Sequence, residues 1–161
     1  MAKKTFPLSK VYSLLESGPV IMVTTSHKGK HNVMPMSWHT MMEFEPPLVG
    51  LIISDANDSF RLLKATGECV INIPTVEIAQ KVVACGNIHG SKVNKFEKFG
   101  LTPGPASKVQ APLIEECYAN LECRVFDTKM VAKYCFFVVE VVKAWIDPKV
   151  KNPQTLHHLG K

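Results

Sequence analysis

Residues 54–59, Ser-Asp-Ala-Asn-Asp-Ser, form the first stretch of the sequence that could do chemistry. They stand between a predicted strand and a predicted helix. The hydroxyls, the amide and the free backbone N–H groups at the helix N-terminus could therefore bind an anion such as a phosphate. Ordinary helix capping explains the same residue types. Asp55 and Asp58 would oppose an anion unless their carboxylates point away, so both interpretations stay open.

A second group of candidates is a run of three hydroxyl residues at the end of a predicted strand: Thr24, Thr25 and Ser26. Three consecutive hydroxyls can hydrogen-bond a ligand. Strand-favouring threonines followed by a turn at Gly29 explain the same run without a ligand.

A third stretch, residues 32–40, combines sulfur and aromatic side chains with polar ones. Met36 and Trp38 suit the flat apolar face of a ring system, whereas Asn32 and Ser37 suit its hydrogen-bonding edge. A core strand anchored by a tryptophan explains the stretch equally well.

The sequence lacks the motifs of the common catalytic classes. His39, His157 and His158 are not accompanied by an HExxH motif or by a Cys/His cluster at zinc spacing, so we expect no metal site. GxSxG, Walker A and GxGxxG motifs are also absent. No side chain therefore stands out as a catalytic acid, base or nucleophile.

Length and composition favour one cytoplasmic domain over residues 1–161. The chain has 161 residues, of which 46% are hydrophobic and 20% charged, and this excludes a disordered protein. No apolar run could span a bilayer, the N-terminus has no secretory signal, and we expect the five cysteines to be reduced thiols. The net charge of +5 favours anionic partners, but the scattered lysines argue against nucleic acid.

Hydrophobic periodicity predicts a mainly β protein with small inserted helices. The predicted strands are residues 20–26, 32–42, 48–54, 68–74, 118–127 and 134–146. The predicted helices are residues 8–17, 59–67, 76–85 and 93–99. Six short strands joined mostly by turns favour an antiparallel barrel or sandwich, because the first three strands follow one another without helices. Pro35 indicates a bend, a bulge or a sheet edge within the second strand.

Taken together, these residues resemble the flavin reductase-like family, and within it the flavoredoxins. The resemblance rests on PVIMVTTSHKGKHNVMPMSWHTMMEFEPPLVGLIIS, NDSF and GECVINIP, and continues through KVNKFEKFGLTP, APLIEECYANLECRV, EVVKAWID and TLHH. It implies a six-stranded antiparallel split β-barrel that forms a homodimer with one FMN per subunit near the interface. Such proteins pass reducing equivalents from NAD(P)H through FMN to free flavin or to a redox partner protein.

The resemblance also implies which residues meet the cofactor. Those beside the flavin would be Thr24, Thr25 and Ser26. Those around the isoalloxazine ring would be Asn32, Met36, Ser37 and Trp38. Those at the phosphate or ribityl chain would be Ser54, Asn57 and Ser59. Lys95 would place a cation at the ring edge, and Tyr134 falls where some relatives have a histidine.

Two alternatives and one departure accompany the resemblance. The protein could be a flavoredoxin-type FMN electron carrier without efficient NAD(P)H oxidation, or a basic β-barrel that binds nucleic acid. Family members usually continue beyond the His157-His158 pair, whereas this sequence ends at Lys161. The sequence therefore predicts a shortened C-terminal segment that lacks a residue near the flavin.

Overall fold

The computed structural model describes residues 2–160; Met1 and Lys161, the ends of the predicted domain, lie outside the described residues. The long strands are β2 (Ile21–His27), β3 (Lys30–Met36), β4 (His39–Phe44), β5 (Pro47–Ile52), β6 (Glu68–Ile73), β9 (Ala119–Asp127) and β10 (Phe136–Ile146). The two-residue strands are β1 (Lys4–Thr5), β7 (Pro103–Gly104) and β8 (Leu113–Ile114). The helices are η1 (Leu8–Lys10), α1 (Tyr12–Leu15), α2 (Asp58–Thr66), η2 (Val76–Ile78), α3 (Ala79–Gly86), α4 (Lys95–Phe99) and α5 (Val131–Tyr134). Within residues 2–160, no helix has the length and hydrophobicity needed to cross a membrane.

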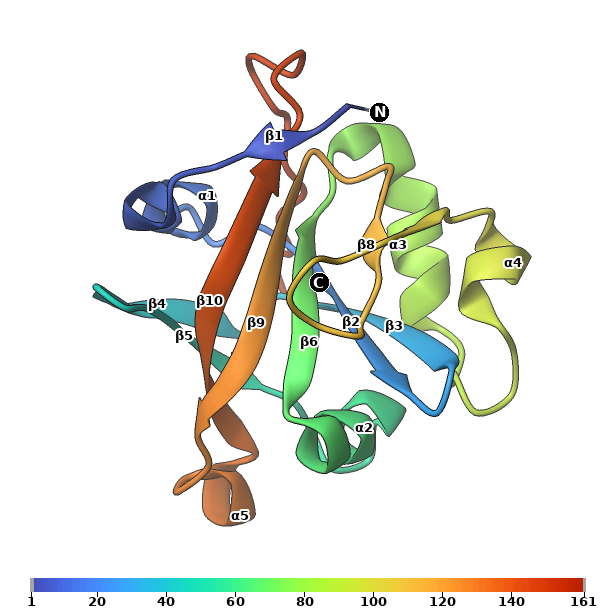
Figure 1. The fold of residues 1–161 in the computed structure, drawn as a ribbon. Helices are drawn as coiled ribbons and strands as arrows, with labels where there is room; N and C mark the ends of the chain where they lie inside the picture. Colours follow the sequence, from blue (N-terminus) through green and yellow to red (C-terminus); the bar gives the residue numbers. More distant parts are fainter. Residues whose placement is uncertain (1, 161) are drawn as a thin grey trace.

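One antiparallel sheet, in the order β3-β2-β6-β9-β10-β5-β4, contains all the long strands (Figure 1). Its two edge strands, β3 and β4, are neighbours in the sequence, joined only by Ser37 and Trp38. The sheet therefore curls so that both edges approach this link, and the barrel is split between them. The predicted mainly β, antiparallel class is confirmed.

The prediction of a single strand over residues 32–42 is wrong. Residues 32–42, predicted as one strand, form the end of β3 and most of β4. Pro35 lies in β3 opposite Met22. β3 is an edge strand with no partner on one side, so a proline, which has no N–H to donate, is tolerated there. After Met36 the chain leaves β2 and pairs with β5 instead, which makes two strands of one.

Two other predicted boundaries also differ. The predicted helix 8–17 is a 3-10 turn, η1, followed by the single-turn helix α1. Tyr134, predicted to begin the last strand, ends α5, and the left-handed backbone of Cys135 then turns the chain into β10.

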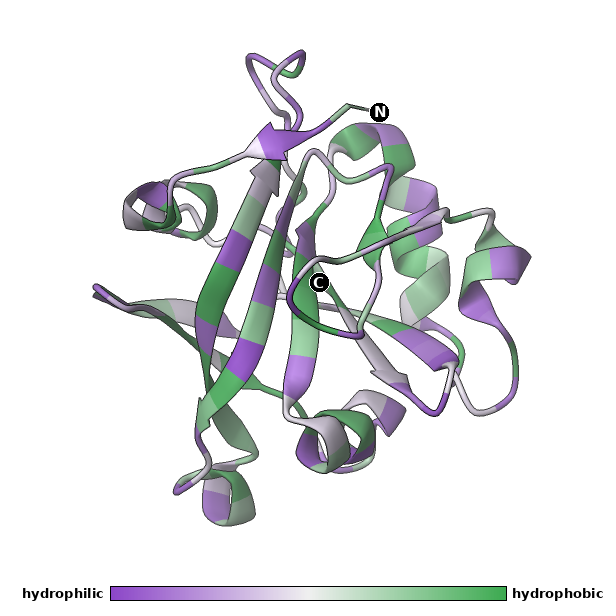
Figure 2. Cartoon of the chain, viewed as in Figure 1, coloured by the Kyte–Doolittle hydropathy of each residue, from purple (hydrophilic) through white to green (hydrophobic). Residues whose placement is uncertain are grey.

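The main hydrophobic core lies on one face of the sheet, and two smaller clusters lie on the other. Residues alternate between them: Val23 and Ile71 belong to the main core, whereas Met22 and Val70 belong to the smaller clusters. Figure 2 shows hydrophobic and hydrophilic bands alternating along β9 and β10.

Phe60 of α2 packs on Phe137 of β10 with ring centroids 5.3 Å apart, so this helix is held against the sheet. Asn57 precedes α2 as its N-cap, and Gly67 ends it in the left-handed conformation. These contacts place the N-terminus of α2 at one end of the barrel.

The convex face of the sheet needs a glycine at one point. A Cβ on Gly50 of β5 would lie 2.3 Å from the ring of Phe136 and 3.2 Å from the sulfur of Met42. Because glycine has no side chain, the Phe136 ring can lie flat across β5 beside Met42.

A buried amide network joins β2, β6 and β9. Asn72 donates to the carbonyl oxygens of Met22 and Val70 and to the Thr24 hydroxyl. Its oxygen accepts from the Ile114 N–H (2.9 Å) and from the Asn120 amide (2.7 Å). Every polar atom of this fully buried side chain is therefore satisfied.

We expect Asn72→Ala to lower the free energy of unfolding by about 2–4 kcal/mol, because it leaves two buried donors without acceptors. Urea denaturation of Asn72→Ala and of Asn152→Ala, which changes an exposed asparagine, measures this. A loss below about 1 kcal/mol in Asn72→Ala would show that the network adds little to stability.

Candidate functional site

A cavity of about 590 Å³ opens at the split of the barrel, where β3 and β5 end. Its walls come from the end of β3 and the link to β4, from the end of β5, from the N-terminus of α2, from residues 85–90 and from Tyr134 and Cys135. The volume is within the range of cofactor and substrate pockets. The split in the barrel thus produces a space of ligand size.

The N-terminus of α2 makes one side of the cavity polar. Ser54, Asn57 and Ser59 all line it, and the Asn57 side chain makes no capping hydrogen bond to the helix. The amide of Asn57 therefore remains available to a ligand beside the positive end of the helix dipole. These residues belong to the stretch 54–59, for which the sequence left an anion site and an ordinary helix cap open.

The Asp58 carboxylate, in the first turn of α2, already has protein partners. One oxygen accepts from Arg61 at 3.1 Å, and the other accepts from the backbone N–H of Ser91 at 2.9 Å. Its charge is thereby partly compensated by a guanidinium on the same helix. The objection that Asp58 would repel an anion is weakened accordingly.

Asn32 gives the cavity wall an unsatisfied acceptor. It is 5% exposed, and its amide nitrogen donates to the Ser59 hydroxyl at 2.9 Å. Its amide oxygen is buried and has no hydrogen-bond partner. A Cβ on Gly90 would lie 2.0 Å from that oxygen, so the loop reaches this close only with glycine there. An unpaired buried acceptor is costly without a donor, and a ligand N–H or O–H group is suited to supply one.

Lys95 places a buried cation in the same wall. Its exposed fraction is 4%, and its ammonium group donates to the carbonyl oxygens of Val33 (2.9 Å) and Cys85 (2.8 Å). Burial lowers the pKa of Lys95 below its usual value, while the Cys85 thiol and Asp58 oppose that shift. Two of its three N–H donors are used, which leaves one for a ligand.

The remaining walls are apolar and partly exposed. Met36 lines the cavity from the end of β3, Trp38 from the β3–β4 link, and Ile52 from the end of β5. Trp38 is 70% exposed, and Tyr134, with Lys133 stacked on its ring, is 55% exposed. Large exposed aromatic surfaces at a cavity mouth suit a planar ring system.

Most of the predicted site residues meet at this cavity. Those that line it are Asn32, Met36, Ser37, Trp38, Ser54, Asn57, Ser59 and Lys95, together with Tyr134. They come from separate segments of the chain that the barrel brings together.

Thr24, Thr25 and Ser26 are not among the residues that line the cavity. β2 is an interior strand, so their side chains are enclosed by protein. The Thr24 hydroxyl donates to the carbonyl oxygen of Pro112 at 2.6 Å, and the Ser26 hydroxyl lies 3.1 Å from the His31 ring. The structure therefore does not bring these three residues beside a ligand in this cavity.

Sequence reasoning missed the loop that forms the opposite wall. Residues 86–90, Gly-Asn-Ile-His-Gly, line the cavity, as do Met34 and Cys135. The two glycines that bound this loop were the available signal, since they allow a close backbone approach.

The fold and the site define an antiparallel barrel, split between its edge strands, with a polar and aromatic cavity at the split. The model of the flavin reductase-like domain matches residues 14–161, and the chain belongs to this family. The structure therefore has the split-barrel fold of that family.

Individual relatives agree with this assignment. An uncharacterized protein from Archaeoglobus fulgidus is 39% identical over 113 residues, which are 70% of this chain and 64% of the relative. The FMN-binding domain of a flavin reductase-like enzyme from Shewanella baltica has a TM-score of 0.89 at 26% identity, covering 97% of this chain and 83% of that one. A flavoredoxin from Methanosarcina acetivorans has a TM-score of 0.71 at 28% identity, covering 81% and 69%.

The Cys85 thiol in the cavity wall should be poorly reactive. Burial raises its pKa to about 11 from 9.0, although the nearby Lys95 opposes the shift. At pH 8 the thiolate fraction is then about a hundredfold lower than in the unfolded chain. We expect iodoacetamide at pH 8, followed by peptide mass spectrometry, to label the more exposed Cys135 first. Equal labelling rates at Cys85 and Cys135 would contradict this.

Proposed function

We propose that this chain binds FMN in the cavity at the barrel split and works as an NAD(P)H-dependent flavin reductase. Electrons would pass on to free flavin or to a redox partner protein. The observation that carries the proposal is the change in polarity along one cavity. One side has the polar N-terminus of α2 and buried hydrogen-bond donors, and the other has the exposed Trp38 ring. The similarity to the FMN-binding domain from Shewanella baltica supports FMN as the ligand.

The residues present fit such a cofactor. Ser54, Asn57 and Ser59 would hold the phosphate with the first N–H groups of α2. The Asn32 oxygen, which lacks a donor in the protein, would accept one from the flavin. Bound FMN would supply the hydride and electron-transfer chemistry, so no catalytic side chain is needed.

Lys95 would contribute charge to the same site. A buried ammonium group favours negative charge on a neighbouring ring system more strongly than an exposed one does. Its two hydrogen bonds to carbonyl oxygens fix its position, so no side-chain reorganisation is required when charge develops.

The compartment proposed for this activity is the cytoplasm. All five cysteines are free thiols, which is typical of proteins in a reducing compartment.

We expect titration with FMN, followed by visible absorption, to give a complex of one FMN per chain. We expect Trp38→Ala to weaken the FMN affinity at least about tenfold. The affinity falls because the variant lacks the aromatic ring that lines the cavity. Since the fold leaves that ring exposed, the free energy of unfolding should not change. Phe44→Ala, which removes another exposed aromatic ring away from the cavity, is the matched control. Equal FMN affinity in both variants would remove Trp38 from the site.

Anaerobic mixing separates the reductase from its alternative, a flavoredoxin-type carrier. Bleaching of the bound flavin by NADH or NADPH within a catalytic time supports the reductase. If neither nucleotide bleaches the flavin while dithionite does, the protein is an electron carrier.

We further propose that two copies associate through the convex face of β5 and β10. Ile52 and Phe136 are cross-strand partners on this face, and Phe136 lies across Gly50 beside Met42. Met42 is 48% and Ile52 is 38% exposed, and the Ile52 N–H donates to the carbonyl oxygen of the 70% exposed Trp38. A contiguous apolar surface of this kind marks an interaction site, and it adjoins the cavity through Ile52.

We expect sedimentation to show a dimer for the parent chain and a monomer for Met42→Glu, because a buried unpaired carboxylate disfavours association. Val83→Glu changes an exposed valine on α3, outside the convex face of β5 and β10, and should remain dimeric. A monomeric parent at micromolar concentration would refute the proposed dimer.

A further inference from the structure

The chain covers only part of the outer, convex face of the sheet with its own segments. Val109 and Leu113 pack with Val70 of β6, and the loop that leads into β8 crosses in front of β6 in Figure 1. Over β5 and β10, Leu48 and Val138 are only half-buried, and within residues 2–160 they belong to none of the three hydrophobic clusters. This uncovered part is the surface through which we propose that two copies associate.

The covered part of the face contains the carboxylate of Glu122 in β9. It accepts hydrogen bonds from the backbone N–H groups of Ser107 and Lys108 and, at 2.7 Å, from the indole N–H of Trp145. Glu122 is fully buried. Here the chain itself supplies the donors that a buried negative charge requires.

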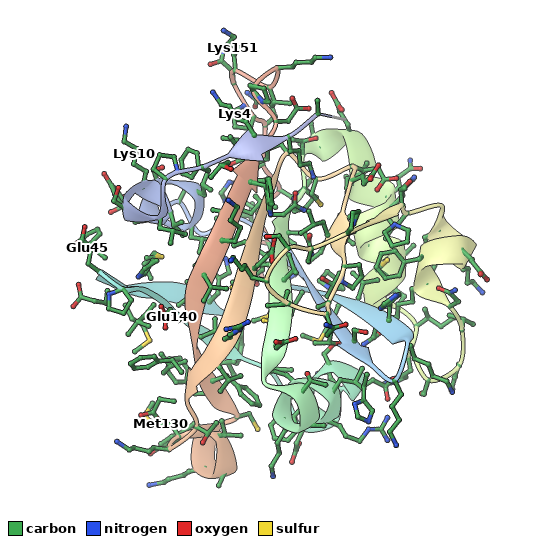
Figure 3. All side chains as sticks on the ribbon, in the orientation of Figure 1. Lys4, Lys10, Glu45, Met130, Glu140 and Lys151 are labelled. Atoms are coloured by element: carbon green, nitrogen blue, oxygen red, sulfur yellow. The ribbon has the colours of Figure 1, made fainter. Side chains whose placement is uncertain are left out.

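Glu140 of β10 carries a negative charge on the uncovered part of the face (Figure 3). In the sheet it stands opposite Leu48 of β5 on one side and opposite Arg124 of β9 on the other. Its side chain is half-buried, and within residues 2–160 its carboxylate takes part in no ion pair. A surface that covers Glu140 must therefore bring a positive group of its own, because an unpaired carboxylate is costly to bury.

Arg124 lies at the border between the covered and the uncovered part. Its Nη2 donates to the carbonyl oxygen of Lys108 at 2.8 Å, and its Nε lies 3.8 Å from the carboxylate of Glu68 on β6. These contacts hold the guanidinium on the side of β6, while the side chain stays 57% exposed. Because a guanidinium has five N–H donors, several remain for a further partner.

The cation of β10 itself is already engaged. Lys143 donates to the Thr5 hydroxyl at 3.2 Å, and its ammonium group lies 4.8 Å from the centroid of the Trp145 ring. Arg124 is therefore the better candidate to meet Glu140. In a two-fold symmetric association, a contact between two different residues of the two copies occurs twice. An acid and a base on the same face are thus self-complementary.

We propose that, in a dimer joined through the convex face of β5 and β10, Glu140 of each copy forms an ion pair with the partner's Arg124. This rests on the dimer proposed above. The two ion pairs fix the register in which the copies meet, and the apolar side chains around them supply the contact area.

Charge reversal tests the ion pair in each homodimer. Glu140→Arg places two arginines at each contact, and Arg124→Glu places two glutamates there. Sedimentation at micromolar concentration should show that each variant alone associates at least about tenfold more weakly than the parent. Glu77→Arg reverses an exposed acid of η2, outside this face, and should associate like the parent. Parent-like association of either variant overturns the proposal.

Mixing the two variants distinguishes a contact between copies from a contact within one chain. In an equimolar mixture of Glu140→Arg and Arg124→Glu, every contact across the interface joins an arginine to a glutamate, so a dimer should form again. If the two residues interacted only within one chain, each chain would keep its like charges and mixing would restore nothing. A mixture that associates no better than its components overturns the proposal.

Glu140→Gln gives a second test that keeps the size of the side chain and needs no reversed charge. It removes one charge from each ion pair, so added salt should weaken the association of the parent more steeply than that of Glu140→Gln. Equal salt dependence of the two proteins overturns the ion pair, even where a reversed variant does not fold.

The same measurements keep the ion pair separate from the proposed dimer. A monomeric parent refutes the dimer through this face, and the ion pair with it. A dimeric parent that responds to Met42→Glu but not to charge reversal leaves the dimer in place and overturns the ion pair alone.

Discussion

The structure depends on the passage of the chain between the two edges of one sheet. Ser37 and Trp38 are all that separates β3, which pairs with β2, from β4, which pairs with β5. The Ile52 N–H donates to the Trp38 carbonyl at 3.0 Å, which ties the link to the end of β5. Because so short a link joins the two edges, the barrel stays open there, and the candidate site is that opening.

Two buried asparagines differ in whether the protein satisfies all of their hydrogen bonds. Asn72 has every polar atom hydrogen-bonded within the sheet, as expected of a residue that only supports the fold. Asn32 donates to Ser59, but its own oxygen has no partner. Side chains of one type, both buried, thus differ in whether the protein completes their hydrogen bonds. The incomplete one lies in the cavity wall, where a ligand can complete it.

Local pattern predicted the strands well, but it could not predict where the chain changes partners. The predicted strands 118–127 and 134–146 contain all of β9 and β10, and Gly67 correctly ended α2. Pro35 was a true sign of an edge, yet no local signal shows that the chain crosses to β5 two residues after Met36. Thr24 has the residue type of a ligand contact, but pairing on both sides of β2 encloses it. Such outcomes depend on long-range pairing, which residue type does not encode.

The contacts of Asp58 bear on how an acidic residue can stand at the proposed anion site. Alone, a carboxylate in the first turn of α2 would compete with a phosphate for the same N–H groups. Here it accepts from the Ser91 N–H, so it holds the glycine-bounded loop 86–90 close to the helix. Gly90, the residue before Ser91, lies against Asn32 in the cavity wall. Asp58, whose charge would oppose the proposed phosphate, therefore also holds part of the cavity wall in place, and Arg61 offsets that charge.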